Sequence, residues 1–357
     1  MSTLLRRPLW FAIAVFAMLA ATIPTPRAAP ARSFADRVRA LSETPGYFDT
    51  DNLISNEASY LHVIPELVES GLSGGAYIGV GPDQNFSYIA QVRPSVAYLV
   101  DIRRDNLLLH LLLKALFDMA PTRIEYLSLL TGRAPPPTRL RESDLALPDV
   151  IGWIDRAPLT DRAALRAAIE KRLRGYAVPL SPDDARSLAR FHDEFIDQGL
   201  DLRFRSHGRA PNSYYPTLRR LLMATDRSGR RWSYLETEAA YAFIRSLHAR
   251  DAIVPVVGDL SGPKAMRAIG AELQNEGLTL SAIYVSNVED YLFRGRRFGA
   301  FVENLRAIPR TPGALIIRSI FRGGPSASEV QPVDDVLAGA SAGRYGSYGD
   351  LIFRPRR

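Results

Sequence analysis

The chain of 357 residues contains no cysteine. This absence excludes disulfide bonds, thiolate catalysis, cysteine-based zinc or iron–sulfur sites, and a lipid attached to an N-terminal cysteine. Lysine is also scarce, because the basic residues other than Lys114, Lys171 and Lys264 are all arginines. The histidines do not have the spacing of a metal site, so we expect no bound metal.

Long apolar runs are scarce too, and the clearest one, from Leu9 to Ile23, follows the pair Arg6-Arg7. It is shorter than the roughly 20 residues needed to span a bilayer. We therefore interpret residues 1–31 as a secretory signal peptide, cleaved near residues 28–31, or as an uncleaved N-terminal anchor. A twin-arginine signal is a weaker alternative, because the residues after the arginine pair fit it poorly. Cleavage predicts an exported protein, periplasmic or secreted; an uncleaved leader predicts anchoring to the inner membrane.

The formal net charge of +7 does not indicate a nucleic-acid partner. Four of the 45 basic residues lie within residues 1–32, which contain no acidic residue, so 41 basic residues face 38 acidic ones in the remainder. With 46% hydrophobic residues, the chain has enough apolar content for a globular core. We expect a small-molecule ligand, no nucleic acid and no stable membrane span unless the leader is retained; the oligomeric state stays open.

Two regions alternate between strand and helix patterns. The first, "AYIGVGPDQNFSYIAQVRPSVAYLVDIRRDN", predicts strands at 76–80 and 96–100 around a helix at 83–92. The second predicts, in order, a strand at 253–257, a helix at 264–275, a strand at 281–285, a helix at 298–307 and a strand at 314–320. Continuous apolar strands alternating with helices predict an α/β fold with a doubly wound, mostly parallel sheet.

No convincing strand pattern occurs between these regions, and we expect a large helical insertion over residues 107–250 of an α/β domain that spans residues 32–320. Capping-box spacing predicts helix starts at Ser181 with Asp184 and at Ser233 with Glu236. Residues 321–357 are rich in Gly, Ser and Arg without a helical or strand period. They are predicted to form a mobile tail.

The turn after the first predicted strand is a candidate ligand site, because glycines let a ligand approach unpaired N–H groups at a helix start. Gly79 and Gly81 match the first two glycines of a dinucleotide fingerprint, but the third position is Gln84. Asp83 would lie beside bound phosphates and repel them. The turn therefore favours a cationic ligand without phosphate, such as S-adenosylmethionine; the alternative for Asp83 is a plain carboxylate at a helix N-terminus.

Asp101 ends the second predicted strand, where an acidic side chain accepts hydrogen bonds from a ribose diol. This position suits both NAD and S-adenosylmethionine. The alternative is an ion pair with Arg103 or Arg104.

Three stretches, "YIGVGPDQNFSYIAQVRPSVAYLVDIRRDNLLLHLLLKALF", "SYLETEAAYAFIRSLHARDAIVPVVGDLSGPKAMRAIGAEL" and "IYVSNVEDYLF", resemble an uncharacterised methyltransferase-like family with the class I S-adenosylmethionine-dependent (Rossmann-like) fold. The resemblance implies that fold and a cofactor pocket, without an established substrate. It assigns cofactor binding to Gly79, Gly81, Asp83, Asp101, Asp259 and Ser286. One departure is Asp83, which replaces the last glycine of the GxGxG pattern that the broader fold prefers.

The third and fourth strand ends carry further candidates. Asp259 is placed to meet the adenine amino group, or else caps the following helix. In "YVSNVEDYL", Asn287 can donate and accept hydrogen bonds, Glu289 is a candidate base and Tyr291 a candidate substrate-orienting residue. The alternative for the last two is a solvated helix face.

His207 is the histidine best placed for catalysis, because it lies among arginines in "RFRSHGRAPNSYY". That loop either covers the pocket and binds an anionic substrate or is an ordinary surface loop. These residues predict methyl transfer from S-adenosylmethionine to an unknown acceptor. The alternative, prompted by the leader, is an exported non-catalytic binding protein on a methyltransferase-like scaffold.

Overall fold

The computed structural model describes residues 32–138, 145–207, 214–321 and 326–353. The chain divides into Met1–Arg32 and a compact unit, Ser33–Arg357, to which the fold belongs. The expected leader, residues 1–31, lies outside the described residues. Within the described part, none of the helices is both long and apolar enough to cross a membrane.

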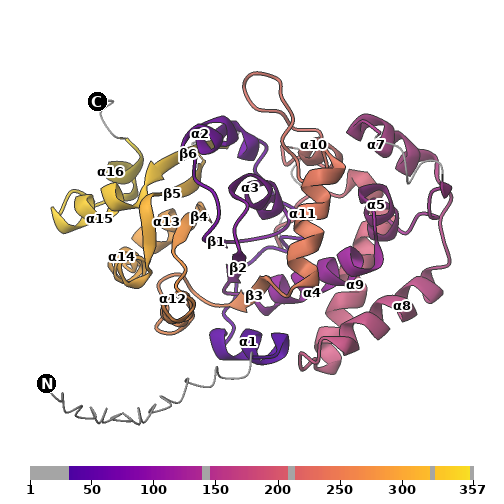
Figure 1. Ribbon diagram of the computed structural model, residues 1–357, viewed down its shortest axis with the longest axis horizontal. Coiled ribbons are helices and arrows are strands. Elements are labelled where there is room, and N and C mark those ends of the chain that lie inside the picture. Colours follow the sequence, from indigo (N-terminus) through magenta and orange to yellow (C-terminus); the bar gives the residue numbers. More distant parts are fainter. Residues whose placement is uncertain (1–31, 139–144, 208–213, 322–325, 354–357) are drawn as a thin grey trace, which may run out of the picture. The chain divides into compact units, whose positions relative to one another are not determined.

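A six-stranded sheet lies at the centre of the unit (Figure 1). Its order is β3-β2-β1-β4-β5-β6; the first five strands run parallel, and β6 runs antiparallel to β5. The expected α/β fold with a mostly parallel sheet is therefore confirmed. The strands are β1 (Ala76–Gly79), β2 (Val96–Asp101), β3 (Ile253–Val257), β4 (Leu280–Ser286), β5 (Arg310–Ile320) and β6 (Ala327–Pro332).

Helices cover both faces of the sheet, which is why β1 and β3 are buried along their whole length. After β1, the chain forms β2 and then β3 on one side of that strand. It then crosses to the other side of β1 and forms β4 there. Right-handed crossovers in opposite directions put helices on opposite faces. One layer holds α2 (Ile64–Glu69), α3 (Gln84–Val92), α4 (Arg104–Met119) and α11 (Glu238–Ala249); the other holds α1 (Phe34–Leu41), α12 (Ala265–Glu276), α14 (Phe298–Ala307) and α15 (Val333–Ser341) (Figure 1).

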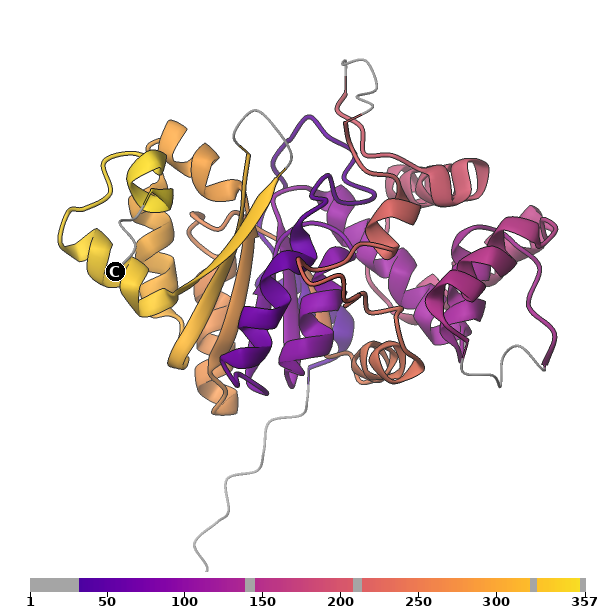
Figure 2. The ribbon, with the colours of Figure 1, turned by 90° about the horizontal axis from the view of Figure 1, so that it is seen from above.

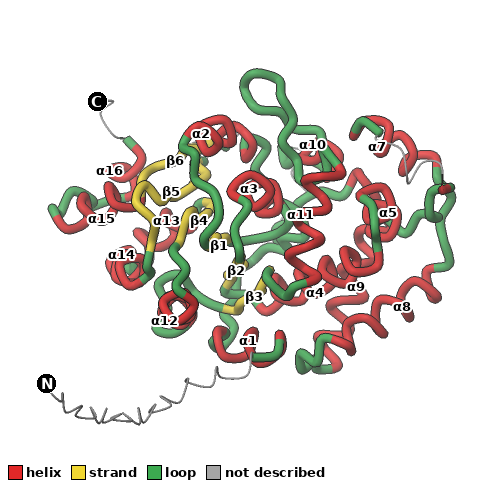
Figure 3. The backbone as a smooth tube through the Cα atoms, viewed as in Figure 1, coloured by secondary structure: helices red, strands yellow, loops and turns green. Residues whose placement is uncertain are grey.

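The described residues between β2 and β3 form helices and loops, with isolated bridges but no strand, as predicted (Figure 3). Two of these helices, α4 and α11, belong to the layer on the sheet. The others pack outward from α4, on the side away from the strands (Figure 2). They are α5 (Arg123–Leu130), α7 (Leu147–Arg156), α8 (Arg162–Gly175), α9 (Pro182–Gln198), η2 (Gly199–Asp201) and α10 (Leu218–Leu222). That residues 107–250 are an insertion stays a prediction.

Of the two predicted capping boxes, only the first is formed. Ser181 and Asp184 cap α9 reciprocally, as predicted. The second prediction is wrong, because α11 begins after Thr237, whose side chain accepts a hydrogen bond from the N–H of Ala240. Glu236 instead forms an ion pair with Arg231. The local spacing was right for a cap, but the chain turns into the helix four residues later in "SYLETE".

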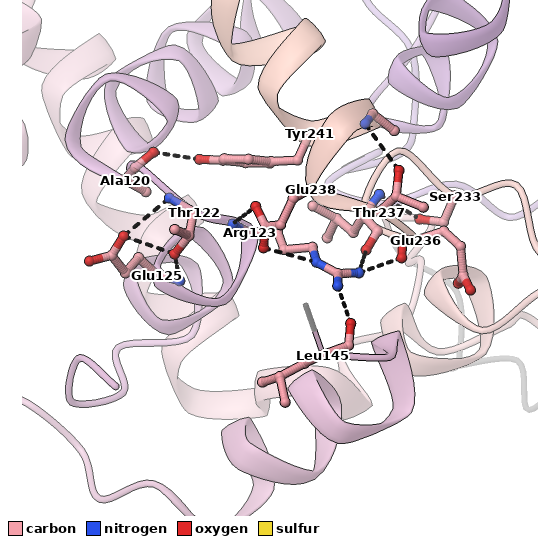
Figure 4. A network of polar contacts seen from close by, with 12 residues as sticks. Ala120, Thr122, Arg123, Glu125, Leu145, Ser233, Glu236, Thr237, Glu238 and Tyr241 are labelled. Carbon is pink, nitrogen blue, oxygen red and sulfur yellow. Dashed lines mark hydrogen bonds and ion pairs between the residues drawn. The ribbon is translucent and has the colours of Figure 1, made fainter. Parts of the chain in front are cut away.

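A buried arginine joins α5 to the start of α11 (Figure 4). The Arg123 side chain is fully buried, and its Nε lies 3.0 Å from Glu238 Oε1. Its guanidinium also donates to the carbonyls of Leu235, Glu236 and Leu145. Since these bonds reach both the start of α11 and the segment just before α7, one side chain of α5 holds the three parts together.

The described residues of the C-terminal segment have regular structure, which the lack of a helical or strand period did not predict; that the tail is mobile stays a prediction. β6 pairs with β5, and α15 then packs against β5. Val333, Val336 and Leu337 are buried in α15, and Leu351 is buried in α16 (Tyr348–Ile352). The apolar residues are too few for a clear periodic pattern, but the sheet edge gives them a surface on which to pack.

Candidate functional site

A cavity of about 300 Å³ opens at the carboxyl ends of the central strands. It is lined by residues after β1 (Gly81, Gln84), at the end of β2 (Asp101, Arg103), after β3 (Gly258, Asp259) and at the end of β4 (Ser286, Asn287). The loop of residues 47–57 and α13 (Val288–Arg294) complete the wall. In open α/β sheets, ligands bind outside the carboxyl ends of the strands where the strand order reverses, which here is between β1 and β4.

The glycine turn after β1 is held by its own side-chain contacts. A Cβ on Gly79 would lie 1.9 Å from Asn85 Oδ1, so glycine leaves room for that amide. Asn85 Nδ2 donates to the carbonyls of Val80 and Pro82, each at 2.8 Å. Gly79 does not line the cavity; Gly81, with φ of +80°, does. Gly81 therefore remains a ligand-binding candidate, whereas Gly79 serves the turn.

His110 supports the same turn from α4. Its Nε2 lies 2.9 Å from the carbonyl oxygen of Gly81 and donates a hydrogen bond to it. Burial lowers the pKa of His110 to about 4, so the ring is neutral at physiological pH. A neutral ring with Nε2–H leaves Nδ1 as an acceptor, and this buried atom has no partner among the described residues.

The structure does not bring Asp83 to the cavity, and this corrects the interpretation of the turn. Its Oδ2 accepts a hydrogen bond from the Tyr234 hydroxyl at 3.0 Å. Burial raises the pKa of Asp83 to about 6. The Asp83 carboxylate, which we expected to attract a cationic ligand, is therefore hydrogen-bonded to Tyr234 in the loop before α11.

Asp101 and Asp259 both line the cavity, and each is already paired with an arginine. Asp101 accepts from Arg103 Nε at 3.0 Å and from Nη2 at 2.9 Å, so the ion-pair alternative is realised. Asp259 pairs with Arg297, another lining residue. Arg103 also donates to the carbonyl of Thr50 at 2.8 Å, which ties the loop of residues 47–57 to β2.

The end of β4 carries two further lining residues. Ser286 has a positive φ of +52°, and its hydroxyl donates to the Glu57 carboxylate. Asn287 is at the N-cap position of α13 but makes no capping hydrogen bond with its side chain. Its Oδ1 lies 3.4 Å from the Ser286 hydroxyl, and the residue lines the cavity wall. Tyr291 packs its ring edge-on against Phe48, 5.1 Å between centroids, and both rings line the cavity.

Two candidate catalytic residues do not line this cavity. Glu289 is fully buried in an ion pair with Arg318, with Oε2 2.6 Å from Nε. A carboxylate bound on both oxygens by a buried guanidinium is a structural group, so its prediction as a base is corrected. His207 donates its backbone N–H to the carbonyl of Asp49 at 2.8 Å. His207 is not among the residues that line the cavity, and the described part of its segment pairs with the loop of residues 47–57. The rest of the predicted covering loop, residues 208–213, lies outside the described residues.

Glu57 is the lining residue that sequence reasoning missed. It precedes η1 (Tyr60–Val63) in "ISNEASY", where no motif or period marks it. It is 1% exposed, and its carboxylate accepts hydrogen bonds from the hydroxyls of Tyr284, Ser286 and Ser319. Burial raises the pKa of the Glu57 carboxyl, and the three hydroxyls oppose that rise. What distinguishes Glu57 from other acidic residues is its burial, and a sequence alone does not show burial.

Together, these features define an α/β protein with a cavity at the strand-order reversal of a mostly parallel sheet. Among the described residues there is no group of three or more His, Asp or Glu side chains suited to a metal ion. The chain belongs to the family described as a domain of unknown function, DUF7790, whose sequence profile matches residues 53–138 and 160–337. No curated protein of known function matches the chain.

Proposed function

We propose that this chain is a methyltransferase-like protein that binds S-adenosylmethionine in the cavity at the carboxyl ends of β1 to β4. The observation that carries the proposal is the convergence of Gly81, Asp101 and Asp259, from three different strand ends, on one cavity. The strand order, with an antiparallel strand at the edge, is compatible with a class I methyltransferase type of doubly wound sheet.

Asp101 is the proposed partner of the ribose diol. Its carboxylate accepts three hydrogen bonds from Arg103, one of them from the backbone N–H at 2.9 Å. A carboxylate offers about four acceptor positions, so a ribose hydroxyl can share it with the arginine. Asp259 and Arg297 lie on the β3 side of the same cavity, where the adenine would bind.

Transfer chemistry in this proposal depends on positioning, with the sulfonium directed at a nucleophile near Asn287. The acceptor is not assigned. An exported binding protein without turnover is the second candidate, favoured because Glu289 and His207 lie away from the cavity wall. Cellular location follows the leader and is tested by a reporter fusion to residues 1–31.

The test is calorimetric titration of the purified chain with S-adenosylmethionine, S-adenosylhomocysteine and NAD. We expect the first two to bind and NAD to bind much more weakly. Asp101→Asn should lower the affinity for S-adenosylmethionine about tenfold or more, as expected for the loss of a hydrogen bond to a charged group. Asp184→Asn is the matched control, because Asp184 forms a similar bidentate pair with Arg104 away from the cavity.

Absence of S-adenosylmethionine binding by folded protein at millimolar ligand would refute the proposal. An unchanged affinity in Asp101→Asn would refute the ribose assignment. If S-adenosylmethionine binds, methyl-labelled cofactor incubated with cell extract separates the two candidates. Label transferred to an acceptor indicates the enzyme, and binding without transfer indicates the binding protein.

A further inference from the structure

Glu57 lies at the opposite end of the cavity from Asp101 and Asp259. Its three hydroxyl donors come from β4 and β5, namely Tyr284, Ser286 and Ser319. Asp101 and Asp259 instead follow β2 and β3. The cavity therefore has two acidic ends, separated by the width of β1.

The charges at the two ends differ in their pairing. The charged residues that line the cavity are Glu57, Asp101, Arg103, Asp259 and Arg297. Four of these form two ion pairs, Asp101 with Arg103 and Asp259 with Arg297. Among the described residues Glu57 has no cationic partner, so the lining carries one unbalanced negative charge when Glu57 is ionised.

Nothing that packs around Glu57 replaces the missing cation. Its titratable neighbours are Tyr77 on β1, Tyr88 on α3 and Tyr284 on β4. Burial holds the pKa of each of these hydroxyls well above its ordinary value, so all three are neutral. A buried carboxylate surrounded by neutral hydroxyls is costly for the folded protein and is typical of a functional site.

Two further features of the wall suit a positively charged ligand. Gln84 is 6% exposed and lines the cavity, and its Oε1 is a buried acceptor without a partner among the described residues. The Phe48 and Tyr291 rings also line the cavity. Aromatic faces attract ammonium and sulfonium groups.

From this combination we propose that Glu57, with Gln84 and the Phe48 and Tyr291 rings, forms a subsite for a positively charged group of a small-molecule ligand. The group is an ammonium or a sulfonium, and its charge balances the Glu57 carboxylate. This subsite deepens the proposed function, on which it rests only for the nucleoside that would occupy the other end of the cavity. It transfers to Glu57 the cation-binding role that the sequence had suggested for Asp83.

The test titrates the purified full-length chain by calorimetry with two pairs of probes. The first pair is choline and its uncharged isostere, in which carbon replaces the quaternary nitrogen. The second pair is S-adenosylmethionine and methylthioadenosine, the neutral thioether nucleoside. Wild type is compared with Glu57→Gln and with Glu303→Gln, a control that removes the carboxylate of an exposed α14 pair with Arg306, away from the cavity.

We expect wild type to bind choline at least about tenfold more tightly than the isostere. In Glu57→Gln that preference should fall to less than about threefold, and methylthioadenosine should bind as in wild type. Glu303→Gln should behave as wild type does. If Glu57→Gln does not fold, the wild-type preference for choline over its isostere, with its loss in Tyr291→Leu, decides the matter.

Three results would overturn the subsite: no binding of either cationic probe, equal binding of choline and its isostere, or an undiminished preference in Glu57→Gln. The two proposals can fail separately. Glu57-dependent binding of choline without binding of either nucleoside would refute the proposed function and leave the subsite standing. Tight S-adenosylmethionine binding that is unaffected by Glu57→Gln would do the reverse.

Discussion

The Tyr284 hydroxyl on β4 donates a hydrogen bond to the carboxylate of Glu57, which lies before the first strand of the sheet. The same hydroxyl accepts a hydrogen bond from Gln84 Nε2 at 3.3 Å. The loop of residues 47–57, the start of α3 and the end of β4 are thus joined at one point of the cavity wall. This point is buried and, apart from Glu57, uncharged. We therefore expect that removing the Glu57 charge raises the stability of the free protein and lowers its affinity for a cationic ligand.

Glu57→Gln should stabilise the free protein at neutral pH. The pKa of Glu57 is raised by burial, so the folded state holds its proton more tightly than the unfolded state does. Stability from this group is therefore present at low pH and is lost as the pH rises through the folded-state pKa. Urea denaturation at pH 5 and pH 8 should show a larger gain for Glu57→Gln at pH 8. A lower stability of the variant at both pH values would contradict this account.

Asp83→Asn should also stabilise the protein, and it should leave ligand affinity unchanged. The pKa of Asp83 is about 6 in the folded state against an ordinary value of 3.8, so its stabilising contribution falls as the pH rises between these values. One unit of pKa corresponds to about 1.4 kcal/mol, and partial exposure reduces the effect, so we expect about 1 kcal/mol at pH 7. Denaturation curves measure the gain. More than a twofold loss of S-adenosylmethionine affinity would restore Asp83 to the binding site.

Glu289→Leu should destabilise the protein by about 3–5 kcal/mol, the usual cost of leaving a buried charge without its partner. Both side chains of the Glu289–Arg318 pair are fully buried. The double variant Glu289→Leu with Arg318→Met should lose less than the sum of the single variants, because neither fully buried charge remains; Glu329, the second partner of Arg318, is 32% exposed. Thermal denaturation of the three variants tests this. A stable Glu289→Leu protein without ligand binding would instead indicate a role at the site.

Arg123→Met should cost about 2–4 kcal/mol, because it leaves three carbonyl oxygens without their donor and removes a partner of Glu238. Arg219→Met is the matched control. Arg219 makes a similar two-point pair with Asp155, but the two side chains are 36% and 44% exposed. An exposed pair contributes less than about 1 kcal/mol. Equal losses of stability in the two variants would be inconsistent with the network in Figure 4.

Gly79→Ala should destabilise the turn by about 1–3 kcal/mol, because the new methyl group displaces the Asn85 amide from its hydrogen bonds. Gly299→Ala in α14 is the control. No atom lies within 4 Å of a Cβ there, and alanine favours a helix over glycine by about 0.5–1 kcal/mol. Opposite signs of the two changes in denaturation midpoint are expected. A neutral Gly79→Ala would show that Asn85 is not needed to hold the turn.

Much of the fold was predictable because its signals are local. Apolar runs bounded by glycine or proline marked the five parallel strands, and α14 has the predicted bounds, Phe298–Ala307. β6 was missed because "ASEVQP" contains one large apolar residue, Val330, so no apolar run marks the strand. Its stability depends on pairing with β5, which no local pattern contains.

The candidate site was predictable in part for the same reason. Positions just after a parallel strand reach the same edge of the sheet, and so Gly81, Asp101, Asp259, Ser286 and Asn287 line one cavity. The roles of Asp83 and Glu289 were not predictable, because they depend on Tyr234 and Arg318. A carboxylate beside a glycine turn looks the same in the sequence whether it faces a ligand or a buried tyrosine.

The amino-acid sequence by itself determined where strands and helices lie and which strand ends carry polar side chains, since backbone preferences and apolar periodicity act over a few residues. Only the tertiary structure decided which charge meets which partner. Glu57 and Ser319 are 262 positions apart, yet they share a hydrogen bond. Burial, pairing and pKa arise from contacts between distant segments, and so the carboxylate that lines the cavity without a cationic partner is Glu57 and not Asp83.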